Sequence, residues 1–318
     1  MATHSSARGS SSQKVRNHLF SNLSWFNRAY LVDWGVLVIL FLCAKAIKDG
    51  PIYERDFAPD DPIISHPQQV DQISGSMNWF MSVVTPMAIG VTLGFLRLSS
   101  HEAHHAALSC FAGWTISSLI TTTLKVRIGR LRPDFLDRCA WDTFNSVCTG
   151  SPKIIREGRK SFPSGHSTTA FSGLGFLFLF LAGKTGAFCL TTVIGRKAHH
   201  SRLLMLILTA WPLALAGWVA VSRVEDYRHH KEDVIVGSLI GFSCACAAYF
   251  IYWPNPFSAR LMASGLASQA RFVYGEDGDT DVDPRAEHFE LAPMHDDEEN
   301  RVLYDEETQA QPVQPNSR

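Results

Sequence analysis

The sequence VIVGSLIGFSCACAAYFIYW, residues 234–253, contains no charged side chain over its full length. As an α-helix rising about 1.5 Å per residue it would measure about 30 Å, which matches the hydrocarbon thickness of a bilayer. An uncharged segment of this length is too long for a buried strand and is typical of a membrane-spanning helix. The stretch therefore indicates an integral membrane protein with an α-helical fold.

Five further apolar stretches precede it in the 318-residue chain. The first and the fourth are short enough to be buried helices of a soluble bundle, but six such stretches together favour an all-α polytopic membrane protein. Tryptophan residues near several stretch ends agree with the aromatic belt of a membrane interface. The predicted spans are residues 31–47, 77–96, 103–124, 167–183, 203–221 and 234–253.

The two ends of the chain differ in composition from this six-span domain, which we predict over residues 31–255. Residues 1–30 are Ser-rich and basic, whereas residues 256–318 form a tail that becomes acidic, lacks hydrophobic periodicity and is expected to be disordered. The net charge is −1, and no nucleic-acid partner is expected without a basic face.

Gly90 and Gly94 allow close helix packing within the chain or between two copies, so the oligomeric state stays open.

An even number of spans places both termini on one face of the membrane and the loops 48–76, 125–166 and 222–233 on the other. Lys and Arg number 14 on each face, so the excess of positive charge that marks cytoplasmic loops does not decide the orientation. The glycosylation sequon Asn22–Ser24 would stay unused if the N-terminus is cytoplasmic.

Three polar motifs lie in the loops of that second face and supply the parts of a phosphate site. Lys125, Arg132 and Arg223 are cations suited to phosphate oxygens, because Arg offers a planar fork of donors and Lys a compact charge. Ser164 and Gly165 would add a hydroxyl and a backbone N–H at a helix start, where anions are favoured. The motifs read KVRIGRLRP over 125–133, PSGH over 163–166 and SRVEDYRHHKED over 222–233.

The same motifs contain candidates for covalent catalysis. His229 and Asp233 are four residues apart and share a face of a helix, so the carboxylate can fix the imidazole tautomer and leave its other nitrogen free to attack phosphorus. His166 would protonate the leaving alkoxide and then activate water. His230 has Asp226 four residues before it, and the chemistry alone does not choose between His229 and His230.

Metal and disulfide chemistry are limited by the residues present. No zinc-type spacing of Cys and His occurs. The acids of the 48–76 loop could bind a cation, but we interpret them as a solvated acidic loop, so no metal cofactor is expected; they are Asp49, Glu54, Asp56, Asp60 and Asp61. Among seven cysteines, Cys139 and Cys148 share one polar loop. They would form a disulfide if the loop faces an oxidising lumen, and would otherwise be two free thiols.

The three motifs resemble the pattern KxxxxxxRP, PSGH and SRxxxxxHxxxD of the type 2 phosphatidic acid phosphatase superfamily, and the chain matches every position. The flanking residues 129–139 and 161–171 are similar to fungal diacylglycerol pyrophosphate phosphatases, and the similarity covers about residues 30–255. The resemblance implies a six-span, magnesium-independent enzyme with its site on the lumenal or extracellular side and with segments 1–30 and 256–318 in the cytoplasm. It places the protein in an endomembrane (vacuole, Golgi or endoplasmic reticulum) or in the plasma membrane.

The resemblance also implies a role for each matched residue. His229 rather than His230 would be the nucleophile, Asp233 would orient it, and His166 would be the acid. The phosphate-binding residues would be Lys125, Arg132, Ser164, Gly165 and Arg223.

The expected reaction is hydrolysis of phosphatidic acid, lysophosphatidic acid and diacylglycerol pyrophosphate, all membrane lipids, through a phosphohistidine. Dolichyl-pyrophosphate phosphatase and sphingoid-base phosphate phosphatase are alternatives with the same chemistry. Vanadium haloperoxidases share the motifs but are soluble, which disagrees with six spans. A non-catalytic scaffold or a transporter is disfavoured because every catalytic position is filled.

Overall fold

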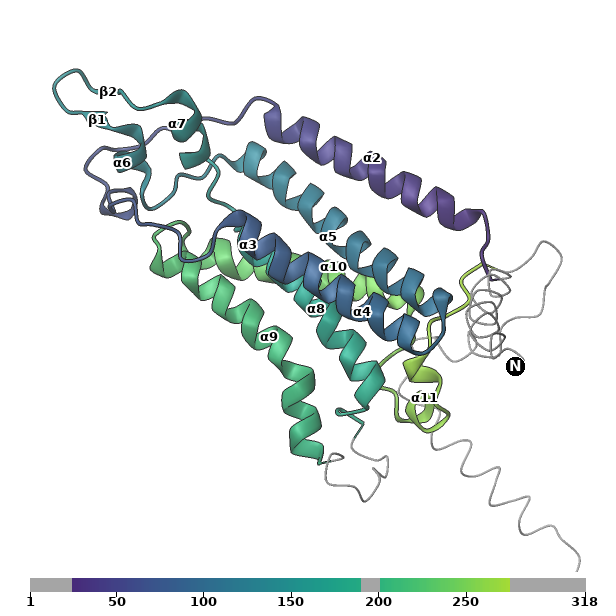
Figure 1. The fold of residues 1–318 in the computed structure, drawn as a ribbon. Helices are drawn as coiled ribbons and strands as arrows, with labels where there is room; N and C mark the ends of the chain where they lie inside the picture. Colours follow the sequence, from purple (N-terminus) through teal and green to yellow (C-terminus); the bar gives the residue numbers. More distant parts are fainter. Residues whose placement is uncertain (1–24, 190–200, 275–318) are drawn as a thin grey trace, which may run out of the picture. The chain divides into compact units, whose positions relative to one another are not determined.

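The protein, in a computed structural model that describes residues 25–189 and 201–274, is built almost entirely from helices (Figure 1). Within these ranges six helical segments are long and apolar enough to cross a membrane, which confirms the predicted all-α, six-span architecture. One of the six is continuous over Gly75–Leu96 but includes a π-helical turn. The segments are α2 (Ala29–Asp49), α3 (Gly75–Trp79) with η2 (Phe80–Val84) and α4 (Thr85–Leu96), α5 (Ser100–Ile128), α8 (Gly165–Thr185), α9 (Arg202–Glu225) and α10 (Lys231–Tyr252).

Helix α8 is the centre of this bundle. It packs against α5, α9 and α10, and most of its residues are buried. A helix that is apolar all round fits such a position, because no side of it needs to face water. Since α8 begins at Gly165, inside the PSGH motif, the most enclosed helix of the bundle also carries part of that motif.

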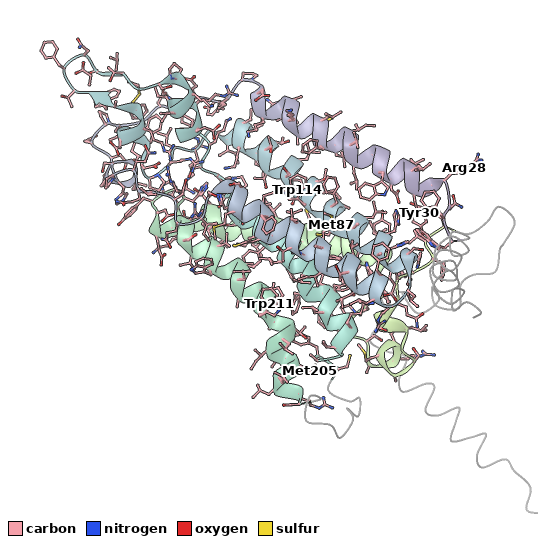
Figure 2. The ribbon with its side chains drawn as sticks, viewed as in Figure 1. Arg28, Tyr30, Met87, Trp114, Met205 and Trp211 are labelled. Atoms are coloured by element: carbon pink, nitrogen blue, oxygen red, sulfur yellow. A yellow bond between two sulfur atoms is a disulfide. The ribbon has the colours of Figure 1, made fainter. Side chains whose placement is uncertain are left out.

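The outer helices present apolar side chains to the surroundings, as lipid contact requires. Leu31 and Ile39 of α2 and Leu203 and Trp218 of α9 are largely exposed. Trp114 of α5, labelled in Figure 2, lies between the rings of Phe41 in α2 and Trp79 in α3, at centroid distances of 6.0 and 6.2 Å.

The Gly90–Gly94 pair forms a close contact between two helices of the same chain. A Cβ added to Gly90 would lie 2.8 Å from the Cβ of Ala106, and one added to Gly94 would lie 2.5 Å from the backbone nitrogen of Ala103. Both contacts are too close for any side chain, so these glycines let α4 approach α5 closely.

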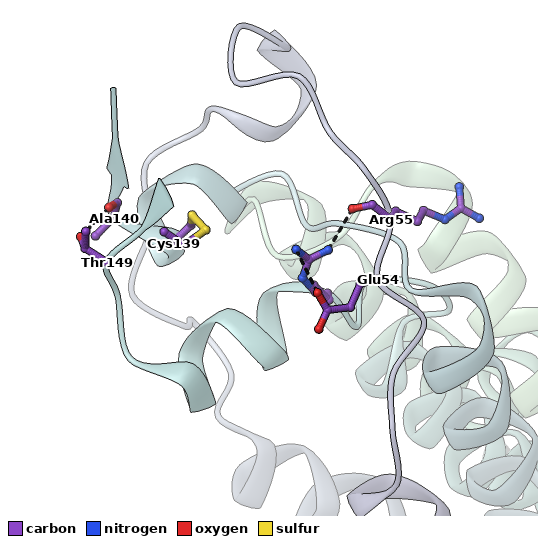
Figure 3. The surroundings of a disulfide bond; sticks show 7 residues. Glu54, Arg55, Cys139, Ala140 and Thr149 are labelled. Atoms are coloured by element: carbon purple, nitrogen blue, oxygen red, sulfur yellow. Dashed lines mark hydrogen bonds and ion pairs between the residues drawn. A yellow bond between two sulfur atoms is a disulfide. The ribbon is translucent and has the colours of Figure 1, made fainter. Parts of the chain in front are cut away.

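The loops that carry the three motifs lie at one end of the bundle together with the short elements (Figure 1). At that end Cys139 and Cys148 are joined by a disulfide next to a two-stranded hairpin with Trp141 opposite Cys148. Figure 3 shows this region, where Arg159 donates to the carbonyl of Arg55 over 2.9 Å. The short elements are η1 (Pro62–Ile64), α6 (Phe135–Cys139), β1 (Trp141–Asp142), β2 (Val147–Cys148) and α7 (Pro152–Gly158).

The described part of the C-terminal region contains α11 (Ala259–Ala263) and η4 (Leu266–Ser268). The Tyr274 hydroxyl donates to Asp33 of α2 over 2.9 Å, so this segment contacts the beginning of the first span. Residues 1–24, with Asn22, and residues 275–318, with most of the predicted acidic tail, lie outside the described residues. The predicted domain boundaries stay predictions.

Candidate active site

Backbone hydrogen bonds join the three motifs at the end of the bundle. The N–H of Ser164 donates to the carbonyl of Asp233 over 2.8 Å, which ties the second motif to the third. The N–H of Ser161 donates to the carbonyl of Arg130 over 2.9 Å, which ties the first motif to the segment before the second. Through these two bonds Arg130 and Asp233, 103 positions apart, are brought into one site.

The first motif begins in the last turn of α5 and continues into a loop. Helix α5 ends at Ile128, and its C-cap Gly129 has a left-handed φ of 58°. A Cβ at Gly129 would clash with the carbonyl oxygen of Tyr53, so only glycine fits this position easily. Lys125 donates through Nζ to the carbonyl of Lys160 over 2.7 Å. Arg132 donates to the carbonyl of Glu157 over 2.9 Å. Both cations therefore face the segment that leads into α8.

The second motif forms the N-terminus of α8. Ser164 is the N-cap, and its hydroxyl accepts a hydrogen bond from the hydroxyl of Ser167 over 2.9 Å. Gly165 is the first helical residue, so its N–H belongs to the donors that a helix leaves unpaired at its start. The Nε2 atom of His166 is buried and has no hydrogen-bond partner among the described residues. A buried imidazole nitrogen of this kind is available to a bound substrate.

The third motif places Arg223 at the end of α9 with only 1% of its side chain exposed. Its guanidinium donates to Asp226 over 2.8 Å and to Asp71, in the loop before α3, over 3.0 Å. The Asp71 carboxylate also lies 2.9 Å from Nε of Arg228. A carboxylate from another loop thus occupies donors of a predicted phosphate-binding residue.

Asp233 is fully buried and accepts hydrogen bonds on both carboxylate oxygens. Its Oδ1 accepts from Arg130 over 2.8 Å, and its Oδ2 accepts from the hydroxyl of Ser161 over 2.5 Å. The Nδ1 atom of His229 lies 3.7 Å from the same Oδ2, which is longer than a hydrogen bond, whereas Nδ1 of His230 lies at 3.3 Å. Both histidines therefore face one carboxylate.

The two histidines differ in what else they do. His230 is the N-cap of α10 and forms a reciprocal capping box with Asp233, so its closeness to the carboxylate serves the start of the helix. His229 lies in the loop before α10 and is 4% exposed. Burial lowers the pKa of His229 well below its ordinary value; Asp233 opposes this shift and the charges of Arg132 and Lys125 add to it. The imidazole is therefore neutral at pH 7, the form that a nucleophile requires.

A cavity of about 270 Å³ lies beside the first two motifs and is lined by Lys125, Arg132 and Gly165. Lys48, Glu157 and Lys160 also line it, together with the hydroxyl-bearing residues Ser118, Thr121, Thr122, Thr168 and Thr169. Within residues 25–189 and 201–274, no group of three or more His, Cys, Asp or Glu side chains is placed to hold a metal ion.

The structure brings together every site residue predicted from the motifs, and it adds residues that the motif pattern does not contain. Arg130 and Ser161 contact Asp233, Asp71 contacts Arg223, and Lys160 lines the cavity. Arg130 stands at an unspecified position inside the first motif and Ser161 lies two residues before the second, and this closeness is the signal that the sequence offers for them. Nothing in the sequence distinguishes Asp71 from the other acids of its loop.

Comparison with known protein families matches residues 106–257, which contain all three motifs, to the PAP2 superfamily. The chain is 34% identical over 269 residues to "Lipid phosphate phosphatase 2" of Arabidopsis thaliana, covering 81% of this chain and 88% of that protein. It is 32% identical over 277 residues to "Diacylglycerol pyrophosphate phosphatase 1" of Saccharomyces cerevisiae, covering 80% and 92%. The "Probable diacylglycerol pyrophosphate phosphatase 1" of Schizosaccharomyces pombe is 34% identical over 213 residues, 64% of this chain and 73% of that protein. No solved structure matches the chain.

Proposed function

Because this chain belongs to the PAP2 superfamily, we propose that it is an integral-membrane lipid phosphate phosphatase acting on phosphatidic acid, lysophosphatidic acid and diacylglycerol pyrophosphate. One observation carries the proposal: the three motifs meet at one end of six membrane-length helices. A phosphate at the bilayer surface reaches this end while the acyl chains stay in the membrane. The names of the similar proteins support lipid phosphates as the substrate class.

The substrate phosphate binds between cations and a helix start. Lys125 and Arg132 neutralise its oxygens, and Gly165 and Ser164 contribute at the N-terminus of α8, where the helix dipole favours an anion. Arg223 joins them once the phosphate replaces the Asp71 carboxylate on its guanidinium. Fixed donors of this kind stabilise the charge on the equatorial oxygens during transfer.

The reaction proceeds through a phosphohistidine. Asp233 orients His229 once the 3.7 Å between Nδ1 and Oδ2 shortens to a hydrogen bond in the substrate complex. Nε2 then attacks phosphorus, the N–P bond forms and the bond from phosphorus to the lipid oxygen breaks. His166 gives a proton to the departing lipid oxygen. In the second step His166 takes a proton from a water molecule, which attacks the phosphohistidine and releases inorganic phosphate. His229 is preferred over His230 because His230 already caps α10.

The positive side chains supply the electrostatic stabilisation that magnesium supplies in many phosphoryl-transfer enzymes, so we propose that hydrolysis needs no metal. Activity should survive an excess of EDTA. Complete loss that magnesium restores would show that the cations are insufficient.

We place the site on the lumenal or extracellular face of an endomembrane or of the plasma membrane, with the termini in the cytoplasm. The disulfide between Cys139 and Cys148 supports this orientation, because disulfides persist in oxidising compartments. A glycan found on Asn22 would reverse the orientation.

The test of the function is phosphate release by the purified protein in detergent micelles without added metal. The panel contains the three proposed lipids, a dolichyl pyrophosphate and a sphingoid-base phosphate, which separates the proposed activity from its two alternatives. His229→Ala should insert normally and lose at least about a thousandfold in rate, as expected for removal of a covalent nucleophile. An active His229→Ala protein would dismiss the phosphohistidine, and an inactive wild-type protein would favour a scaffold or a transporter.

A further inference from the structure

We propose that the cavity beside Lys125, Arg132 and Gly165 of the first two motifs holds a second phosphate of the substrate, and that Lys160 is its main ligand. The inference rests on the proposed function and deepens it, because it makes a lipid diphosphate the substrate for which this site is built. The matched motifs contain neither Lys160 nor Lys48, the second cation of this part of the cavity.

The cavity has room for more than one phosphate. Its volume of about 270 Å³ is roughly twenty times the ~10–15 Å³ that one ordered water needs. It extends from the motif cations along one face of α5, from Lys125 to Ser118, which is about 10 Å at 1.5 Å per residue. Its basic end holds the charged residues, and its hydroxyl-lined end reaches into the span.

The charge of the cavity favours a diphosphate over a monophosphate. Four basic side chains (Lys48, Lys125, Arg132 and Lys160) and one carboxylate (Glu157) line it, so basic groups outnumber acidic ones by 4 − 1 = 3. A phosphate monoester carries about −1.5 to −2 at neutral pH, and a further phosphate group adds about −1. A diphosphate headgroup therefore offers an anionic partner to more of these basic side chains than a single phosphate does.

Lys160 is placed to contact an anion inside the cavity. Only 5% of its side chain is exposed, and burying a cation is costly unless an anion compensates it. Its Nζ lies 3.0 Å from Glu157, whose carboxylate is 43% exposed and is the single negative group of the cavity. Its backbone carbonyl accepts the hydrogen bond from Nζ of Lys125, so the Lys160 residue is in direct contact with a motif cation.

During hydrolysis of a diphosphate the terminal phosphorus bonds to His229, and the bond from that phosphorus to the bridging oxygen breaks. The bridging oxygen leaves on the phosphate that stays attached to the lipid. Negative charge therefore increases on that second phosphate, and Lys160 stabilises it as it departs.

Lys160 also has a structural contact, because its Nζ lies 3.4 Å from the carbonyl of Lys48 at the end of α2. Arg156 provides a matched control, since it donates to the same carbonyl over 3.0 Å and to that of Gly50 over 2.6 Å. The Arg156 side chain is not part of the cavity lining. Lys160→Met and Arg156→Met thus both loosen the end of α2, but only the first removes a cation from the cavity.

The experiment compares kcat/KM for diacylglycerol pyrophosphate and for phosphatidic acid in wild type, Lys160→Met, Lys160→Arg and Arg156→Met. Lys160→Met should lower kcat/KM for the diphosphate at least tenfold and that for the monophosphate less than threefold. Lys160→Arg should retain most of the diphosphate activity, and Arg156→Met should change both substrates equally. The inference would be overturned if Lys160→Met lowered kcat/KM equally for both lipids. It would also be overturned if Arg156→Met lowered kcat/KM selectively for diacylglycerol pyrophosphate.

A measurement on the wild-type protein covers the case in which Lys160→Met does not fold. Methylenediphosphonate, a diphosphate that cannot be hydrolysed, should inhibit phosphatidic acid hydrolysis at a concentration at least tenfold lower than orthophosphate does. Equal inhibition by the two would overturn the second-phosphate site while leaving the phosphatase activity intact. Absence of hydrolysis of any lipid phosphate would instead overturn the proposed function.

Discussion

The hydroxyl of Ser161 lies 2.5 Å from Oδ2 of Asp233, the oxygen that also faces Nδ1 of His229. Both side chains are buried, so this hydrogen bond is shielded from water. Ser161 therefore restricts the position of the carboxylate that orients the proposed nucleophile, although it is not part of the motif that contains either residue.

Replacing Ser161 by Ala should lower kcat about 10–100-fold and leave KM within about threefold. Hydrogen bonds to charged groups contribute about 1.5–3 kcal/mol, and a misplaced Asp233 affects the attack rather than lipid binding. Steady-state kinetics with phosphatidic acid measures both constants. Ser161→Thr, which keeps the hydroxyl, should recover most of the rate, and a change confined to KM would argue against a positioning role.

Replacing Asp71 by Asn should lower KM for every lipid phosphate by about two- to fivefold. The neutral amide no longer competes with the phosphate for Arg223 and Arg228, and exposed or half-exposed ion pairs contribute about 1 kcal/mol or less. Asp137→Asn is the control, because Asp137 holds the same loop through the N–H of Gln68 over 2.7 Å. If Asp71→Asn raises KM while Asp137→Asn does not, the carboxylate assists binding instead of competing with it.

The stability of the protein should fall on acidification because of His229. Its pKa is lowered in the folded state, so below the ordinary value of about 6.5 the unfolded chain binds a proton that the native site excludes. The stabilisation is present above about pH 6.5 and is lost as the pH falls below it. Between pH 7.5 and 5.5 the melting temperature should drop more in wild type than in His229→Gln, since other groups contribute equally to both. Parallel curves would show that His229 titrates normally.

The Cys139–Cys148 disulfide should stabilise the loop that follows Arg132. Closing a loop with nine residues of sequence separation contributes about 2–3 kcal/mol through the unfolded chain. The double variant Cys139→Ser with Cys148→Ser should melt several degrees lower and should no longer shift on a gel upon reduction. Reduction of the wild type that leaves the melting temperature unchanged would indicate that the loop is held by its other contacts.

Hydropathy predicted each span to within a few residues, and the errors at the ends that carry motifs have one cause. The last span begins at Lys231 rather than at residue 234, and the third extends to Ile128 rather than to residue 124. The additional turns are polar, because they carry the motifs. Residues such as Lys125 and Asp233 therefore lie on helix ends, where a helix fixes their direction better than a loop would.

The spacing of residues within the motifs identified the residues that meet in the site. It did not predict the hydrogen bonds and ion pairs that keep those residues in place. Asp71 and Arg223 are 152 positions apart, and Ser161 and Asp233 are 72 apart. No local pattern links such residues; their meeting depends on how the helices pack around α8. Long-range partners of a motif are for this reason visible only in the folded chain.

The close contact of Gly90 and Gly94 with α5 has a consequence for experiments on excised segments. A synthetic peptide of residues 75–96 alone would expose a small-residue groove and should self-associate in micelles. In the intact chain Ala103 and Ala106 already fill that groove. A reporter assay that fuses a single span to a readout requiring dimerisation would therefore detect self-association of this span. The whole protein does not offer this face to a second copy, because α5 already covers it.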